Sequence, residues 1–322
     1  MTPDFASAPL RLVVALGGNA ILRREDDGSI ATQYRRAADA MVHVAKLAGA
    51  GHLLCVTHGN GPVVGNIVLR NEAARDTITP MPLYIAVADS EGGLGLMLQM
   101  SLGNAVDDVP VDREVLTIVT QVVVDRDDPA FQHPSKPIGP YYDAGQLEAV
   151  RATEPDWEFV EVPDCGWRRV VPSPRPKRIV EAGPIRRLME LGDIVIAAGG
   201  GGVPVIEGPA RHLTGIDAVI DKDWASALLA KEVEADLLVI LMESDRLYAD
   251  WGTPDQHGVD RLTADEADEL VASGQLERGS ITPKIAASAW FARETGREAV
   301  ICRAEDLGPA LAGSAGTRVV PN

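Results

Sequence analysis

The chain has 322 residues, of which 46% are hydrophobic, so it can bury a substantial core in one large domain or two lobes, which argues against a disordered chain. Its formal net charge of −17 repels polyanions, so we expect no nucleic-acid and no anionic-membrane partner. No run approaches 18 consecutive apolar residues, and residues 1–9 do not resemble a signal peptide, so we expect a cytoplasmic protein.

Short apolar runs alternate with segments of helical period along the chain. This alternation is typical of βαβ units and predicts an α/β fold with a mainly parallel sheet. The expected strands are 11–17, 52–57, 115–124, 193–206, 236–242, 298–303 and 317–320. The expected helices are 32–48, 62–75, 177–191, 221–234 and 283–295.

The stretch 125–176 interrupts this pattern. It is rich in prolines, aspartates and aromatic residues, and it shows neither helical nor strand periodicity. An interruption of about 50 residues in a compact domain is usually a functional insertion or a disordered segment. The aromatic content favours an ordered subdomain that protrudes from the sheet.

Cysteines and histidines give no sign of a disulfide framework or a metal site. The cysteines are Cys55, Cys165 and Cys302, an odd number with no CxxC pair, and the histidines have no ligand spacing. Cys55 and Cys302 lie in apolar runs, so we expect buried structural thiols in a reducing compartment.

Three glycine-rich turns, at 17–19, 58–62 and 199–202, each follow an expected strand. In a parallel sheet these turns share the carboxyl edge, where ligands bind, and glycines let backbone N–H groups approach an anion closely. Glycine also ends strands for purely geometric reasons, so one turn alone is weak support. Three together favour a phosphate or carboxylate ligand, although no P-loop, dinucleotide fingerprint or protein-kinase motif is present.

Lys222 and Lys284 each fall in the first turn of an expected helix. Asp221 can cap the first helix, and Thr282 with Pro283 can cap and open the second. A cation there opposes the helix dipole at a cost of about 0.3–1 kcal/mol unless an anion lies between them. Either lysine alone could be a solvated surface residue, but the pair beside the glycine turns indicates a bound anion.

Phosphoryl transfer suits such a site because its transition state needs alignment and charge stabilisation more than covalent help. An acid acceptor already carries an anionic oxygen, so no general base is required. His58 could bind substrate, but the glycines and Asn60 explain its loop equally well.

Six motifs in chain order make the sequence resemble the carbamate kinases of the amino acid kinase family. They are LGGNAIL (16–22), THGNGPVVGN (57–66), KPIGPYYD (136–143), RRVVPSPRPKRIVE (168–181), AAGGGGVPVI (197–206) and GIDAVIDKDWASALLA (215–230). The resemblance implies a three-layer αβα sandwich, a protruding subdomain at about 125–170 and a homodimer. It also implies that 1–210 binds the acid or carbamoyl phosphate and that 211–322 binds ATP or ADP with Mg²⁺.

The resemblance carries roles onto individual residues. It implies catalytic roles for Lys222 and Lys284, with Asp223 orienting them. The implied substrate and phosphate contacts are Gly17, Gly18, Asn19, Gly59, Asn60, Lys136, Gly200 and Gly201. The implied nucleotide contacts are Glu243, Tyr248, Ile281 and Lys284, with no protein ligand for the Mg²⁺ that the nucleotide carries.

The chain departs from the family pattern at three places. Residues 241–248 read LMESDRLY instead of LTDVDGVY, so Arg246 replaces a glycine that can need an unusual backbone conformation. Residues 279–284 read GSITPK instead of GSMGPK. Glu91 stands in SEG where the family has SQG, and a carboxylate facing the pocket would weaken binding of carbamoyl phosphate.

Three functions therefore stay open. The first is a carbamate kinase that runs from carbamoyl phosphate and ADP toward ATP. The second is a paralogous kinase for another small carboxylic or carbamic acid, suggested by the three departures. The third is a non-catalytic relative that binds a nucleotide or an acyl phosphate, against which the retention of both lysines argues.

Overall fold

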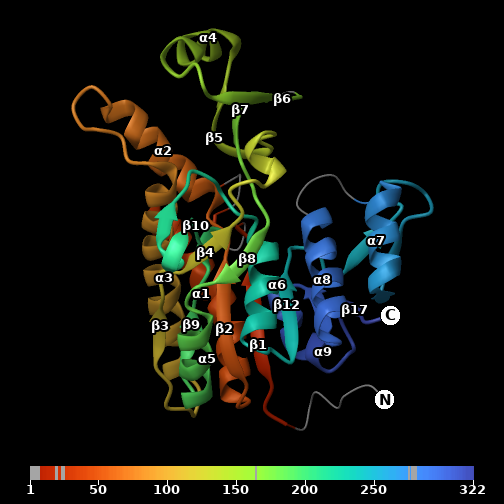
Figure 1. Cartoon of the computed structure of the whole chain (residues 1–322). Helices are drawn as coiled ribbons and strands as arrows, with labels where there is room; N and C mark the ends of the chain where they lie inside the picture. The colour runs from red at the N-terminus through yellow and green to blue at the C-terminus, as the bar shows by residue number, and fades with distance from the viewer. Residues whose placement is uncertain (1–7, 19–20, 23–25, 164, 275, 277–280) are drawn as a thin grey trace.

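A central sheet organises the molecule, for which a computed structural model describes residues 8–18, 21–22, 26–163, 165–274, 276 and 281–322. Its strands follow the order β15-β17-β16-β12-β1-β2-β9-β3 (Figure 1). Neighbouring strands are parallel except β16 and β17, so the predicted mainly parallel sheet is confirmed. The bounds are β1 Arg11–Leu16, β2 Leu53–His58, β3 Val115–Thr117, β9 Ile194–Ile196, β12 Leu237–Leu241, β15 Arg261–Thr263, β16 Glu298–Cys302 and β17 Thr317–Val320.

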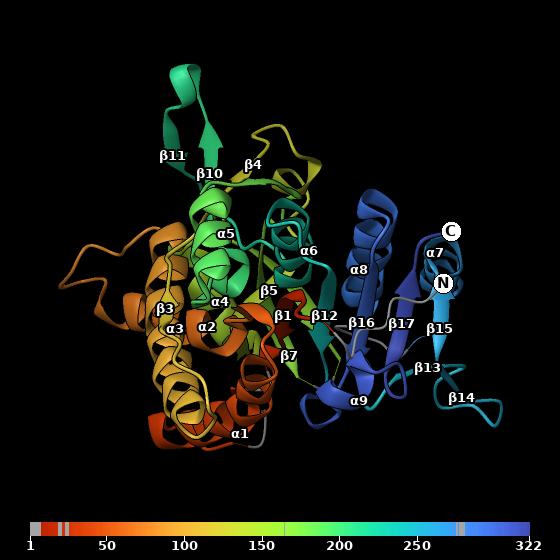
Figure 2. The ribbon, with the colours of Figure 1, turned by 90° about the horizontal axis from the view of Figure 1, so that it is seen from below.

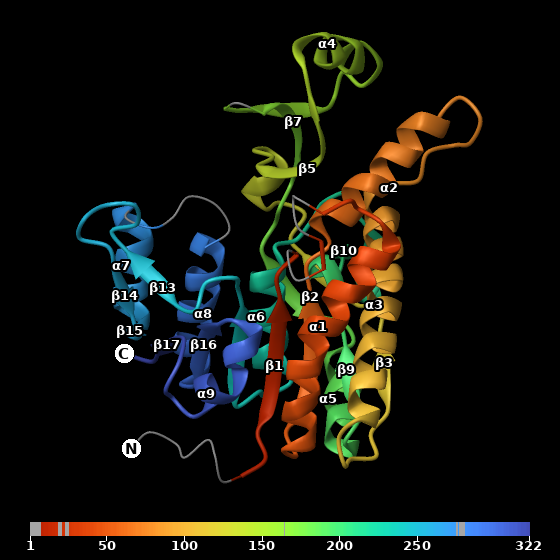
Figure 3. The same ribbon diagram turned by 180° about the vertical axis from the view of Figure 1, so that it is seen from behind.

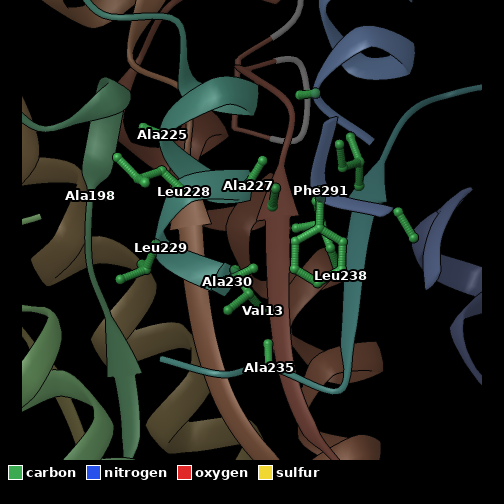
Figure 4. Close-up of a cluster of buried hydrophobic side chains, with 14 of the residues drawn as sticks. Val13, Ala198, Ala225, Ala227, Leu228, Leu229, Ala230, Ala235, Leu238 and Phe291 are labelled. Atoms are coloured by element: carbon green, nitrogen blue, oxygen red, sulfur yellow. The ribbon is translucent and has the colours of Figure 1, made fainter. Parts of the chain in front are cut away.

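Helices cover both faces of this sheet, as can be seen in the view from below in Figure 2. On one face lie α1 (Ile30–Gly49), α3 (Leu83–Asp107) and α9 (Leu307–Leu311), and on the other lie α5 (Ala182–Leu191), α6 (Lys222–Glu232) and α8 (Ile281–Thr295). Successive side chains of β1 point to opposite faces of the sheet, so this strand packs against both helical layers. Leu12 and Val14 pack against the first layer. Val13 packs against the second layer, together with Phe291 and side chains of α6 (Figure 4). The expected αβα sandwich is confirmed. Two further helices are α2 (Gly61–Ala74) and α7 (Ala264–Ser273).

Three expected elements are divided in the structure. The run 115–124 forms β3 and then β4 (Gln121–Val124), which belongs to a second sheet with β8 (Pro176–Ile179), β10 (Val203–Glu207) and β11 (Leu213–Gly215). The run 193–206 forms β9 and β10 around a glycine turn, and 177–191 forms β8 before α5. Apolar and β-branched residues continue through the break at 118–120, so the period alone could not locate it.

The segments 136–163 and 165–171 form a unit that stands away from the central sheet (Figures 1 and 3). β5 (Lys136–Tyr142), β7 (Gly166–Val171) and β6 (Glu158–Val162) form a three-stranded sheet, and α4 (Ala144–Thr153) packs beside it. Its aromatic residues account for the order: the Phe159 ring meets Tyr142 edge-on at 5.7 Å between centroids, and the Arg169 guanidinium lies over Trp157.

Cys55 and Cys302 are fully buried, as expected, and burial raises the pKa of each thiol to about 12. Within the described residues, no helix is long and apolar enough to cross a membrane. β13 (Leu247–Ala249) and β14 (His257–Val259) form a separate hairpin after β12.

Candidate functional site

The three glycine turns meet at the carboxyl edge of the sheet, as the sequence predicts. The first two turns follow the neighbouring parallel strands β1 and β2. A Cβ atom at Gly59 would lie only 3.1 Å from the backbone nitrogen of Gly18 and 3.3 Å from Cδ of Lys222. The glycine is therefore required for the close approach of two turns and a lysine stem.

The third turn closes on the second. Gly200 and Gly201 have φ of +66° and +98°, which favour glycine, and a Cβ at Gly200 would lie 2.1 Å from Nδ2 of Asn60. The Asn60 side chain is buried and donates a 2.7 Å hydrogen bond to Ser90 Oγ. The first turn thus packs against the second, and the second against the third, along one edge of the sheet.

Beside these turns, Asp223 lies between Lys222 and Lys284. Its Oδ1 accepts from Nζ of Lys222 at 2.7 Å, and its Oδ2 accepts from Nζ of Lys284 at 3.1 Å. The two lysines come from the first turns of α6 and α8, which pack against each other. The structure therefore brings together the three residues expected to be catalytic.

This cluster holds two ammonium groups against one carboxylate, and all three side chains are largely buried. Burial lowers the pKa of Lys222 to about 8, although Asp223 opposes the shift. Burial by itself raises the pKa of Asp223, but Lys222 and Lys284 outweigh it and lower that pKa to about 2. Since an unpaired buried charge is costly, the excess positive charge favours an anionic ligand.

The first turn of α6 is fixed from both sides. Asp221 caps the helix, as expected, by accepting from the backbone N–H of Asp223 at 2.9 Å. Ser226 Oγ lies 2.6 Å from Thr57 Oγ1 and donates to the Lys222 carbonyl, which ties α6 to the end of β2. Sequence reasoning missed Ser226 and Thr57, although a serine inside a helix can donate to the backbone carbonyl four residues earlier.

Lys136 reaches the same region from the protruding segment. Its Nζ lies 2.7 Å from Oδ2 of Asp221, so the first residue of β5 contacts the cap of α6. The lysine expected to act from the subdomain therefore lies beside the Lys222–Asp223–Lys284 cluster without being part of it.

The expected nucleotide contacts lie around the end of β12. Glu243 follows that strand, Tyr248 lies in β13 and donates to Asp245 at 2.9 Å, and Ile281 begins α8. Arg246 forms ion pairs with Asp245 and Asp260. Its backbone φ is not positive. The replacement of glycine at this position therefore causes no left-handed strain.

Some expectations change at residue level. α8 begins at Ile281, so Thr282 and Pro283 lie inside its first turn instead of forming the cap and the first position. Asn19 lies outside the described residues. Glu91 is 1% exposed and accepts from the backbone N–H of Gly199 at 2.9 Å, so its carboxyl group is bound to a glycine turn and is not exposed in an open pocket.

Two cavities lie elsewhere in the described structure. One of about 430 Å³ lies between α1 and α9, and one of about 470 Å³ lies beside β4 and β10; neither is lined by the lysine cluster. In the described part of the chain, no group of three acidic, histidine or cysteine side chains could hold a metal ion. Two buried ammonium groups beside three glycine turns have the charge that would suit a transferring phosphoryl group.

Comparisons with known proteins agree with this geometry. The model of the amino acid kinase family matches residues 10–303. The carbamate kinase of Pyrococcus horikoshii is 41% identical over 97% of this chain and 100% of its own length. The carbamate kinase-like protein YahI of Escherichia coli is 40% identical over 96% and 98%. The structure of Giardia lamblia carbamate kinase bound to AMP-PNP aligns with a TM-score of 0.90 and 36% identity, over 98% of this chain and 99% of that one.

Proposed function

Because this chain belongs to the amino acid kinase family, among its carbamate kinases, we propose that it transfers a phosphoryl group between ATP and carbamate. In this reaction a carbamate oxygen forms a bond to the γ-phosphorus of ATP while the bond to the ADP oxygen breaks, giving carbamoyl phosphate. We propose that it runs physiologically in reverse, from carbamoyl phosphate and ADP to ATP. The observation that carries the proposal is the pair of buried ammonium groups on one carboxylate at the glycine-lined edge.

Each group of the site has a task in this proposal. Lys222 and Lys284 would contact the oxygens of the transferring phosphoryl group, where negative charge shifts between acceptor and leaving group. Asp223 would hold both ammonium groups in place through its hydrogen bonds. The turns at Gly17–Gly18, Gly59–Asn60 and Gly200–Gly201 would bind the phosphate and the acid, and Lys136 would reach the carbamoyl group.

Nucleotide binding is supported by the AMP-PNP complex of the Giardia relative. We propose that Glu243, Tyr248, Ile281 and Lys284 contact the nucleotide. The described residues offer no cluster of protein ligands for a metal, so Mg²⁺ would be held by the nucleotide phosphates, where it neutralises charge.

The direct test is ATP formation from ADP, Mg²⁺ and carbamoyl phosphate in a coupled assay. Robust turnover that is lost in Lys284→Ala supports the proposal. Nucleotide binding without any ATP formation from carbamoyl phosphate would contradict it.

A kinase for another small carboxylic acid is the second candidate, because one relative at 40% identity is named only as carbamate kinase-like. The sequence departures at 241–248 and 281–282 lie on the nucleotide side and in the first turn of α8. A screen of small acids for ADP release distinguishes the candidates, since activity confined to carbamate excludes this one.

We further propose that residues 1–210 bind the acid and 211–322 the nucleotide. The turns after β1, β2 and β9 lie in the first part, whereas β12, β13 and α8 lie in the second. A chain with Gly59→Ala should therefore lose affinity for carbamoyl phosphate and keep its affinity for ADP, as measured by calorimetry. An equal loss for both ligands would contradict this division.

A homodimer is also proposed, with α3 as its contact surface. Leu96 and Met100 of α3 are 54% and 50% exposed, and Val42 of the neighbouring α1 is 47% exposed. Light scattering should give the mass of two chains for the wild type and of one chain for Leu96→Glu. A dimer that persists in Leu96→Glu would place the contact elsewhere.

A further inference from the structure

Gly199 packs against two buried side chains from different elements. A Cβ atom at this position would lie 2.3 Å from Nε2 of His58, at the end of β2, and 2.9 Å from Cγ of Glu91, on α3. His58 is completely buried and Glu91 is 1% exposed. Both side chains therefore flank the glycine that begins the third turn.

The hydrogen bonds of these two side chains leave one atom unpartnered on each. Nδ1 of His58 lies 3.1 Å from the carbonyl oxygen of Gly59, which can only accept, so Nδ1 carries the proton and Nε2 is an acceptor. Oε1 of Glu91 accepts from Gly199 N–H. Nε2 of His58 and Oε2 of Glu91 are buried and make no hydrogen bond in the described structure.

If Glu91 were ionised, both unpartnered atoms would be acceptors buried beside the same glycine, an arrangement that costs free energy. A proton on Oε2 turns this atom into a donor, and Nε2 of His58, which flanks the same glycine, is an acceptor without a partner. One proton between the two would satisfy both atoms while Oε1 stays on the Gly199 N–H.

We propose that Glu91 carries this proton and shares it with Nε2 of His58, and that the shared proton holds the Gly199 turn against the Gly59–Asn60 turn. Glu91 is thus a positioning residue for the anion-binding edge. Its loss of the proton at alkaline pH loosens the turns and weakens binding of the acid substrate.

The surrounding charges agree with a proton on the carboxyl group. Burial, aided by Glu181 ahead of α5, raises the pKa of Glu91 to about 8, although the nearby Gly199 and Thr120 oppose the shift. Burial, aided by Lys222 at the start of α6, lowers the pKa of His58 to about 4, so the imidazole stays neutral. Asn60 and Ser90, the other polar neighbours on the second turn and α3, do not titrate.

Carboxyl ¹³C NMR of the whole protein, labelled in glutamate, tests the proton without any assay of activity. We expect one glutamate resonance to titrate near pH 8 and to disappear in Glu91→Gln. If every glutamate carboxyl group titrates below about pH 6, within the usual spread of glutamates in proteins, the proposal is overturned. This measurement needs only the wild type, so a poorly folding variant does not block it.

The kinetic arm rests on the proposed function. Burial brings the pKa of Glu91 and the pKa of Lys222 each to about 8. As the pH rises through about 8, the wild type should therefore lose one proton from each residue, and kcat/KM for carbamoyl phosphate should fall with the loss of both. In Glu91→Gln the amide can still donate to Nε2 but cannot ionise. The fall in kcat/KM should then correspond to the loss of only one proton, the one on Lys222. Glu232→Gln is the matched control. Glu232 also accepts a hydrogen bond from a backbone N–H, that of Ile179, but it lies at the end of α6 opposite Lys222. This variant should show the same two-proton fall in kcat/KM as the wild type.

The two arms separate the possible failures. A two-proton fall in Glu91→Gln overturns the inference even if the enzyme is active. If no carbamoyl phosphate is used at any pH, the proposed function fails, and the NMR titration still decides whether Glu91 holds the proton.

Discussion

Asp223 accepts from two ammonium groups and can neutralise only one of them. The positive charge left over is buried at the carboxyl edge of the sheet, beside the glycine turns. A cation in this position stabilises a charge that develops in a transition state more than a solvated lysine could, because it is already oriented and poorly screened.

Replacement of Lys284 by alanine tests this role. We expect kcat to fall at least a hundredfold, equivalent to about 3 kcal/mol, because one electrostatic stabiliser of the transition state is lost. Steady-state ATP formation measures the effect. Lys231→Ala is the control, since Lys231 is an exposed lysine of α6 that pairs with Glu294, and its loss should leave kcat unchanged. A loss below tenfold for Lys284→Ala would mean that the residue is misassigned.

Asp223→Asn tests the electrostatic balance. Two buried ammonium groups would lose their counter-charge, so the free energy of unfolding should fall by about 3 kcal/mol in urea titrations near neutral pH. The folded-state pKa of Asp223 is lowered to about 2, so its stabilising effect is present above about pH 4 and is lost as pH falls toward 2. The variant should lack this acid-dependent part, and a destabilisation below 1 kcal/mol would contradict the account.

At the scale of elements, the site depends on turns that accept no side chain. Gly200 combines a positive φ with contact to Asn60, whereas Gly192, after α5, has φ of +100° and no atom within 4 Å of a Cβ. An alanine at Gly192 would therefore cause backbone strain alone, whereas an alanine at Gly200 would cause backbone strain and a collision with Asn60.

Gly200→Ala and Gly192→Ala form a matched pair. We expect Gly192→Ala to cost about 1–2 kcal/mol of stability through strain alone, with kinetics unchanged. Gly200→Ala should add a collision with Asn60 and raise KM for carbamoyl phosphate at least tenfold. Urea unfolding and steady-state kinetics of both proteins give the comparison, and equal KM values would show that the turn does not shape the site.

Helix α3 shows where local patterns fail. Its 25 residues include Gly92, Gly93, Gly95 and Gly103, which lower helix propensity, and no helix was expected there. Packing against α1 and the sheet overrides this propensity. The same helix carries Ser90 and Glu91, so an element that sequence reasoning did not assign supports two of the three turns.

At the scale of the whole molecule, Lys136 connects the protruding segment to the site. It bonds to Asp221, so a movement of the three-stranded sheet would change the position of this ammonium group relative to the cap of α6. If Lys136 binds the acid as proposed, this contact would link acid binding to the placement of the segment.

Lys136→Met should raise KM for carbamoyl phosphate at least tenfold while the Kd for ADP changes less than twofold, because the nucleotide contacts lie on the other side of the cluster. Lys177→Met is the control, since Lys177 also forms an ion pair, with Asp125, but is more exposed and belongs to the second sheet. Equal effects of the two variants on KM would contradict a role for Lys136 in substrate binding.

The sequence alone determined the mainly parallel sheet, the three glycine turns at its edge and the two lysines in first helical turns. These features are written in local signals: apolar period, glycine after a strand, and capping residues. The family resemblance also implied that Asp223 orients Lys222 and Lys284, and the structure supplies the hydrogen bonds. Only the tertiary structure decided that 115–124 divides between two sheets, and that Glu91 and His58 flank Gly199. Those contacts join residues far apart in the chain, and which of them form depends on packing that no local pattern encodes.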